Sequence, residues 1–339
     1  MAEYLLKRLI LAIFTLLVIL LVSYTLLRLA PGDPTRSDLF GGGEGAGVAD
    51  ASKGGFSGNR ALREKLNLDR PILVGFALWL KAVVTEGDFG ESAVVDPGRP
   101  VTRIILDRLP VTVTLNFWAI LLTYLLAIPL GVYSAVRVGG VLDRTTTLGL
   151  FILYSLPVMW VGLLLQSLIC EGGRWEIFPL RGVTPPDPDS LSIWQLQLET
   201  IRYYLLPVFC LAYGGFAGLS RYARSGMLEV IGSDYIRTAR SKGVPEMRVI
   251  WVHAFRNALI TLITLFGGLL PSLVAGSVLV EYIFNIPGMG ALSLLALSSR
   301  DYPLLMALFA FAGFLTLLGI LISDLLYVAV DPRIKLSRS

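Results

Sequence analysis

Six long runs of apolar residues, none of which contains a charged side chain, dominate the pattern of this chain. They are residues 9–27, 109–136, 145–170, 203–220, 257–280 and 302–323. A hydrocarbon core of about 30 Å needs about 20 helical residues to cross it. The runs are continuous and do not alternate between apolar and polar positions, so they indicate helices and not barrel strands. The pattern predicts an all-α integral membrane protein with six transmembrane helices.

The runs divide the chain into three predicted parts. Residues 1–29 form an N-terminal transmembrane helix, residues 30–103 an extracytoplasmic loop with short helices, and residues 104–339 a core of five helices that includes a polar loop at 226–256. The first run is longer than the about 7 to 15 residues of a signal-peptide core, and no small-x-small cleavage site follows it. We therefore expect a retained anchor.

Basic residues in the short loops predict the orientation. With six spans both termini lie on one side, together with the loops at 137–144 and 221–256, and this side carries 14 of the Lys and Arg residues. On the other side, in residues 28–107, acidic and basic residues nearly balance. The termini are therefore predicted to be cytoplasmic, with a small helical cap between the first and second spans outside.

Composition agrees with a lipid environment. Hydrophobic residues make up 55% of the chain and charged residues 16%, and mean hydropathy is +0.70. A water-soluble globule of 339 residues has no interior for so much apolar surface. The net charge of +4 follows from the membrane topology, so we expect no nucleic-acid partner.

The external segments are predicted from their turn residues. Residues 40–58 are rich in glycine and are expected to form a flexible loop, whereas residues 60–66 have helical composition. Pro71 is suited to open a second short helix that runs through Trp79. Residues 171–202 contain several Pro and Asp residues and are expected to be irregular.

The internal loop carries a predicted short helix. Ser233 suits an N-cap, Asp234 places a negative charge in the first turn, and Gly243 suits the C-terminal end. A helix of about nine residues is unstable alone in water, so it needs a partner surface. The contacts available to it are apolar at Tyr235 and Ile236, small at Ala239, and basic at Arg237, Arg240 and Lys242.

A second helix is predicted to begin at Pro245. Its residues Met247, Ile250, Trp251 and Ala254 are spaced to share one face. From the residues alone, two interpretations of this basic loop stay open: an interfacial helix that binds anionic lipid, and a docking element for a protein partner.

Several motifs resemble one family. Residues 229–243, EVIGSDYIRTARSKG, followed by VIWVHAFRNA at 249–258, resemble the EAA loop of bacterial ABC-importer permeases, and most closely that of the dipeptide, oligopeptide and nickel branch. The remaining matches occur in the same order along the chain: PGDP at 31–34, GDFGES at 87–92, IFNIPGMG at 283–290, RDYP at 300–303 and DPRI at 331–334.

The resemblance implies a mechanism and a set of partners. In this family the loop helix is a coupling helix that sits in a cleft of a cytoplasmic ATPase subunit. The residues expected at this interface are Ser233, Asp234, Tyr235, Ile236, Arg237, Thr238, Ala239, Arg240, Lys242 and Gly243. The implied partners are a second homologous permease, two ATPase subunits, an extracytoplasmic binding protein and the lipids of a bacterial inner membrane. The implied cargo is a di- or oligopeptide or a related small solute, moved by alternating access.

No chemistry is expected in the chain itself. It has no GxxxxGK[ST] phosphate loop, so ATP and Mg²⁺ would be bound by partner subunits, and we expect no catalytic residue, cofactor or metal site. The single histidine, His253, is expected to be structural. Cys170 and Cys210 are expected to be buried thiols without a disulfide.

Polar residues near the spans are candidates for the translocation path. These are Asn116, Gln166 and Glu281, although Glu281 is also suited to bind loop amides. An ion-coupled carrier is one alternative function, but it needs carboxylates at mid-span and none of the six runs has one at its centre. A membrane scaffold that recruits a partner through its basic loop is another alternative.

Overall fold

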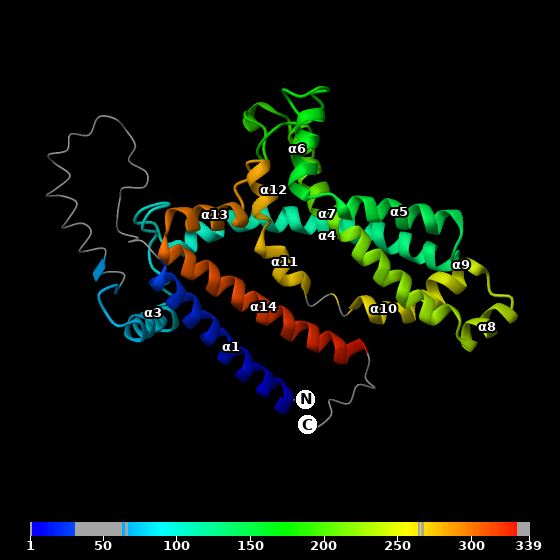
Figure 1. The fold of residues 1–339 in the computed structure, drawn as a ribbon, viewed down its shortest axis with the longest axis horizontal. Helices are drawn as coiled ribbons and strands as arrows, with labels where there is room; N and C mark the ends of the chain where they lie inside the picture. Colours follow the sequence, from blue (N-terminus) through cyan, green and yellow to red (C-terminus); the bar gives the residue numbers. More distant parts are fainter. Residues whose placement is uncertain (1, 31–62, 65–66, 264, 266–267, 331–339) are drawn as a thin grey trace. The chain divides into compact units, whose positions relative to one another are not determined.

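The computed structural model describes residues 2–30, 63–64, 67–263, 265 and 268–330. The predicted Gly-rich loop at 40–58, most of the predicted helix at 60–66 and the motifs at 31–34 and 331–334 lie outside these residues. All named elements of the described chain are helices, in agreement with the predicted fold class. Figure 1 shows their arrangement along the chain.

Four described helices are long and apolar enough to cross a membrane. They are α1 (Ala2–Leu29), α4 (Val101–Val136), α7 (Ile193–Ile231) and α14 (Tyr302–Val330). The predicted third span is a bent pair, α5 (Val141–Ser155) and α6 (Val158–Ile169), which meet at 92°. If this pair counts as one span, the described residues hold up to five.

The bend has a local cause at Pro157, which follows Leu156 in an extended conformation. Proline lacks the N–H that a continuing helix needs and disfavours helical dihedrals in the residue before it. The hydroxyl of Tyr213 on α7 donates to the carbonyl of Leu156 at 2.8 Å. The break therefore has its own hydrogen-bond partner, and the prediction of one straight helix over 145–170 is wrong.

The predicted fifth span is also interrupted. It contains α10 (Phe255–Ile263), α11 (Leu269–Ala275) and α12 (Val278–Ile283), and α13 (Met289–Ser299) follows. Gly276 separates α11 from α12 with a φ of +70°, a conformation that L side chains rarely adopt. One straight helix over 257–280 is therefore also a wrong prediction.

The helices α3 (Ile72–Glu86) and α7 extend into residues that are not predicted to be helical. α3 has Pro71 as its N-cap, as expected, but continues past Trp79 to end at Gly87. α7 begins at Ile193, because Ser192 and Gln195 form a reciprocal capping box at its start. The prediction that residues 171–202 are irregular is therefore wrong from Ile193 onward, whereas the preceding segment holds only the short 3₁₀ helix η2 (Pro188–Ser190).

The helices group into two compact units, and the first combines residues 1–108 with 292–317. Its core is apolar and joins α1, α3 and α14 through Leu20, Tyr24, Phe76, Met306 and Ala310. Arg28 at the end of α1 donates to three backbone carbonyls, those of Asn67, Leu68 and Arg70. These bonds attach residues 67–70 to the end of α1.

A buried carboxylate organises the loop before α4 within the same unit. Asp301 is fully buried and accepts hydrogen bonds from the Ser92 hydroxyl and from three successive backbone N–H groups, those of Ala93, Val94 and Val95. The RDYP and GDFGES motifs therefore meet through one side chain. A buried charge is tolerated here because several donors compensate it.

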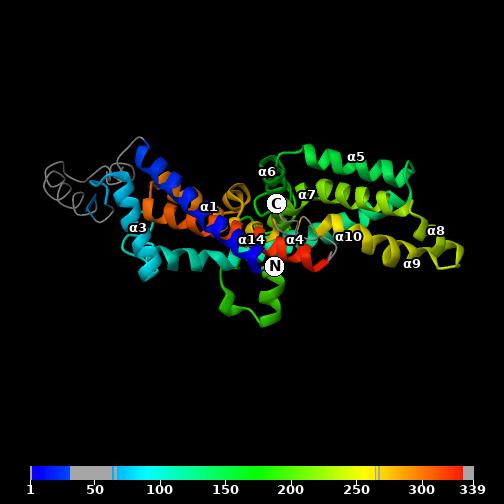
Figure 2. The same ribbon diagram turned by 90° about the horizontal axis from the view of Figure 1, so that it is seen from below.

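The second unit combines residues 109–291 with 318–339 and contains the internal loop. Beyond α7 come α8 (Asp234–Ser241), α9 (Glu246–Arg248) and the π-helix η3 (Val249–Ala254), before α10. α7 packs against α5, α6 and α10. Figures 1 and 2 both show α8 and α9 past the end of α7 that lies away from α6.

Candidate functional site

The predicted helix of the internal loop exists and has eight residues, Asp234–Ser241. Ser233 has the extended backbone of an N-cap, but its hydroxyl donates to the carbonyl of Val230 and makes no cap bond to the helix. Gly243 has a φ of +76°, and its N–H donates to the carbonyl of Arg240 at 2.9 Å. The loop helix therefore ends at a glycine that turns the chain, as predicted.

One side of α8 is attached to the rest of the chain. Ile236 has 0% of its surface exposed, and Ala239 packs against the same cluster. The apolar side chains around them come from α4, α7, η3 and α10: Val132, Ala135, Met227, Val249, Ile250, Ala254 and Ala258. The partner surface that such a short helix needs is thus partly supplied by its own unit, and Ile236 faces inward.

The other side of α8 is open and polar. Asp234 and Arg237 lie 3.4 Å apart with side chains that are 96% and 72% exposed. Tyr235 is half exposed, and Asn257 on α10 donates to its hydroxyl at 2.9 Å. Further exposed positions of this face are Thr238, Arg240, Lys242 and Gly243. The structure therefore exposes seven of the ten predicted interface residues. Ser233 and Ala239 are half-buried, and Ile236 is buried.

An ion pair between Arg240 and Glu246, called the clasp below, closes the loop after α8. Arg240 donates to both carboxylate oxygens of Glu246, the nearer at 2.7 Å, across the turn at Gly243. This hydrogen bond lowers the pKa of Glu246 below its usual value and raises that of Arg240. Because both side chains are about half exposed, solvent screens the attraction and the pair contributes less than about 1 kcal/mol.

The helix after Pro245 differs from its prediction. Ile250 and Ala254 are buried as expected, but Met247 is exposed and Val249 is buried instead. The reason is the π-helix at Val249–Ala254, because its wider turn places residues five apart on one face. The prediction that Met247 shares one face with Ile250 and Ala254 is therefore wrong.

The three candidates for a translocation path all make hydrogen bonds within the second unit. Asn116 on α4 donates to the carbonyl of Leu273 at 3.0 Å, and Gln166 on α6 donates to that of Ile283 at 2.9 Å. These carbonyls belong to α11 and to the end of α12, so both amides hold the interrupted fifth segment. A broken helix at membrane depth needs such partners for its backbone.

Glu281 is the third candidate and has only 2% of its surface exposed. Its carboxylate accepts from the N–H groups of Ala291 and Ser277, at 2.8 and 3.3 Å, and from the hydroxyl of Thr112. Thr112 in turn accepts from the N–H of Met289 at 2.7 Å. Of the two roles open to Glu281, the contacts match binding of loop amides.

Two residues that position these segments carry no signal in the sequence. Thr112 and Tyr213 each lie inside an apolar run, where a single hydroxyl does not indicate a role. Both hydroxyls donate hydrogen bonds to segments that are distant in the chain, Thr112 to Glu281 and Tyr213 to the carbonyl of Leu156. Among the described residues no group of three or more His, Cys, Asp or Glu is placed to hold a metal ion. Cys170 and Cys210 are both buried free thiols.

Comparison with known proteins decides the family. The model of the "binding-protein-dependent transport system inner membrane component" matches residues 127–336, and that of the N-terminal part of such components matches residues 1–116. The chain belongs to this family. It is a permease subunit of an ABC importer in a bacterial inner membrane.

Relatives of the permease match along their whole length. The oligopeptide transport system permease protein AppB of Bacillus subtilis is 39% identical over 99% of this chain and 100% of its own. The inner membrane ABC transporter permease protein YejB of Escherichia coli O157:H7 is 33% identical over 98% of this chain and 99% of its own. Importers of this family work with ATPase and substrate-binding partners.

A solved structure shares the fold of the permease. A chain of the MetNI methionine ABC transporter, in an inward-facing conformation, aligns with a TM-score of 0.51 and 17% identity, over 67% of this chain and 96% of the other. At this identity the likeness concerns the fold.

Proposed function

We propose that this permease moves di- or oligopeptides, or related small solutes, by alternating access. Several relatives are named as permeases of oligopeptide or peptide transport systems, and they match the chain end to end. In the proposed topology each broken run crosses the membrane as one span, which gives six spans with both termini in the cytoplasm. The basic loops at 137–144 and 221–256 then lie on the cytoplasmic side.

The proposed mechanism assigns the energy source to other subunits. The permease pairs with a second homologous permease, receives cargo from an extracytoplasmic binding protein, and contacts two ATPase subunits that bind ATP and Mg²⁺. It carries no cofactor and hydrolyses nothing itself. α8 is the contact through which closure of the ATPase pair reaches the spans.

One observation carries this assignment: α8 has two unlike sides. Ile236 fixes one side in the apolar core beside α4, α7 and η3, while the other side presents exposed charges. A force applied to the polar side is passed to the spans because the attached side cannot yield independently. A lipid-anchored interfacial helix would instead expose its apolar side chains.

Charge reversal on α8 tests the proposal. The full complex with wild-type permease, Arg237→Glu or Arg144→Glu is reconstituted into liposomes, and uptake of labelled di- and oligopeptides is measured together with ATP hydrolysis. We expect Arg237→Glu to lower ATP-driven uptake at least about tenfold, since loss of a charge-assisted contact costs about 1.5–3 kcal/mol. Arg144→Glu reverses a charge on the other short loop and should retain uptake within about twofold.

Unchanged uptake in Arg237→Glu would overturn the coupling role. Uptake that persists without ATP and follows a proton or sodium gradient would favour an ion-coupled carrier instead. A third outcome concerns the cargo only. If ATP-driven uptake depends on Arg237 but occurs with a non-peptide solute and with none of the peptides assayed, the assignment of peptides as cargo is overturned while the coupling role stands.

A further inference from the structure

A small cavity with a mixed apolar and polar lining lies between α4, α5 and α7, wholly within the second unit. Its volume is about 160 Å³. For comparison, a cavity of about 150 Å³ holds a benzene ring, so the space suits a group of five or six heavy atoms. Its polar lining consists of five hydroxyl-bearing and two basic residues: Ser134, Thr146, Thr147, Tyr154, Ser220, Arg221 and Arg224.

Several donors of this cavity have no acceptor in the described part of the protein. The hydroxyls of Thr146 and Thr147 make no hydrogen bond to these residues, and Arg221 forms no ion pair with them. The guanidinium of Arg221 lies over the ring of Phe151, 5.4 Å from its centre. The Nε of Arg224 is buried and also lacks a partner. The lining therefore offers hydrogen-bond donors to a ligand with several acceptor oxygens.

The charge of the cavity favours an anion. Arg224 pairs with Asp143 at 3.0 Å, and Asp143 also accepts from the N–H of Gly139 at 2.9 Å. The Oδ2 atom of this carboxylate is therefore engaged by the protein, while Oδ1 is buried without a hydrogen-bond partner among the described residues. Arg221, one turn from Arg224 on the same helix, forms no ion pair with the described residues and adds a positive charge to the cavity.

The cavity lies where three helices change from apolar to charged. Arg221 is the first charged residue after the uncharged run 203–220, Arg137 follows the run 109–136, and Arg144 precedes the run 145–170. Residues Leu148 and Ile152 of α5, next to the lining, are exposed and apolar. A phosphate held here would place attached acyl chains against this apolar face, at the depth of a lipid headgroup.

We propose that this cavity binds the phosphate headgroup of an anionic membrane lipid such as phosphatidylglycerol. Arg221 is the main charge, the hydroxyls of Thr146 and Thr147 donate to the phosphate oxygens, and α5 contacts the acyl chains. The lipid bridges α5 and α7 beside the loop-side end of α4. The site is independent of which solute the permease moves.

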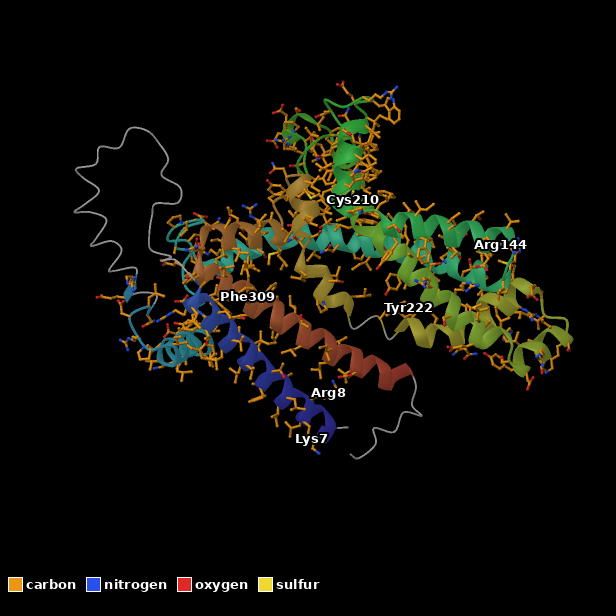
Figure 3. The ribbon with its side chains drawn as sticks, in the orientation of Figure 1. Lys7, Arg8, Arg144, Cys210, Tyr222 and Phe309 are labelled. Carbon is orange, nitrogen blue, oxygen red and sulfur yellow. The ribbon has the colours of Figure 1, made fainter. Side chains whose placement is uncertain are left out.

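Native mass spectrometry of the intact complex tests this site. The probe is phosphatidylglycerol titrated against a phosphatidylcholine background, with permease carrying Arg221→Gln, Thr147→Val or the matched control Arg144→Gln. Arg144 lies at the loop-side end of α5, outside the lining, whereas Arg221 adjoins Tyr222 on α7 (Figure 3). Since a basic residue contributes about 1 kcal/mol to anionic-lipid binding, Arg221→Gln should weaken phosphatidylglycerol binding about fivefold. Arg144→Gln should stay within about twofold of wild type.

Three outcomes would overturn the proposal. Equal weakening by Arg221→Gln and Arg144→Gln would mean that only general surface charge attracts the lipid. Equal binding of phosphatidylcholine would remove the role of net charge. Displacement of phosphatidylglycerol by free glycerol phosphate at matched concentration would assign the site to a soluble phosphate. Arg221→Lys keeps the charge but loses the planar fork, so intermediate binding by this variant supports the assigned geometry and excludes misfolding as the cause.

Discussion

The carboxylate of Glu281 is held where two glycines, Gly276 and Gly288, leave room for it. An added Cβ at Gly288 would lie 2.5 Å from the Glu281 carboxyl carbon and 2.6 Å from the Thr112 hydroxyl, and one at Gly276 would lie 2.7 Å from Glu281 Oε1. An added Cβ at Gly290 would instead meet the backbone of Val278, 2.6 Å from its nitrogen. The glycines of the IFNIPGMG motif therefore allow close approach of the backbone to a buried charge.

Gly288→Ala is expected to destabilise the permease. The methyl group must displace Glu281 or the loop, and overpacking of this kind costs about 1–3 kcal/mol. The measurement is thermal unfolding of the purified protein in detergent. Gly232→Ala is the control, because no atom lies within 4 Å of a Cβ at that position and its φ is negative. Equal unfolding temperatures for the two variants would contradict the packing described at Gly288.

Protonation of Glu246 is expected to loosen the clasp with Arg240. Because its pKa is lowered in the folded protein from the usual 4.5, the pair stabilises the loop fully above about pH 4.5. This contribution disappears as the pH falls through the lowered pKa. At pH 7, Glu246→Gln should therefore raise amide exchange in α8 slightly, by less than about fivefold for such an exposed pair. At a pH well below the lowered pKa of Glu246 the variant and the wild type should exchange alike. A difference that persists once the carboxyl group is protonated would show that its charge is not the cause.

At the scale of elements, two predicted spans are broken and each break is bound by side chains from other helices. The Tyr213 hydroxyl donates a hydrogen bond to the carbonyl of Leu156 between α5 and α6. The side-chain amides of Asn116 and Gln166 donate to the carbonyls of Leu273 in α11 and Ile283 in α12. These bonds replace the backbone partners that a continuous helix would provide. The bends are therefore fixed features of the fold.

Tyr213→Phe is expected to destabilise the bend between α5 and α6. The change leaves the partly buried carbonyl of Leu156 without its donor, at a cost of about 1 kcal/mol. Thermal unfolding of the permease measures this loss. Tyr222→Phe, on the exposed side of the same helix, serves as the control and should change stability little. If both variants have the same unfolding temperature as the wild type, the hydrogen bond of Tyr213 does not stabilise the bend.

At the scale of the whole molecule, the proposed coupling requires a rigid attachment of α8 to its own core. Ile236→Ala removes a fully buried side chain, which typically costs about 2–5 kcal/mol, at a site away from the exposed polar face. The complex should still assemble and hydrolyse ATP, while peptide uptake per ATP falls. Parallel assays of uptake and hydrolysis in proteoliposomes measure this ratio. Ser241→Ala, at an exposed position of α8 outside the predicted interface, should leave the ratio within about twofold. An unchanged ratio in Ile236→Ala would contradict the proposed coupling through α8.

The sequence predicts where this chain meets lipid more readily than how it bends there. Runs without charge locate the membrane helices, and the Ser233, Asp234 and Gly243 signals locate α8, because both depend on local chemistry. The direction in which Ile236 points depends on residues from four other elements, so α8 alone cannot show it. Likewise, Thr112 and Tyr213 gain their roles only when distant segments meet.

The π-helix between α9 and α10 holds about one residue more than a regular helix with the same total turn. Each residue of a regular helix advances the chain by about 100° around its axis, and each residue of a π-helix advances it by less. Loss of one residue from Val249–Ala254 with a return to regular winding would therefore leave the following helix in nearly the same orientation. Insertion of one residue would instead rotate Ala258 out of the interior and turn Asn257 away from Tyr235. We expect this stretch to accept a single-codon deletion more readily than a single-codon insertion.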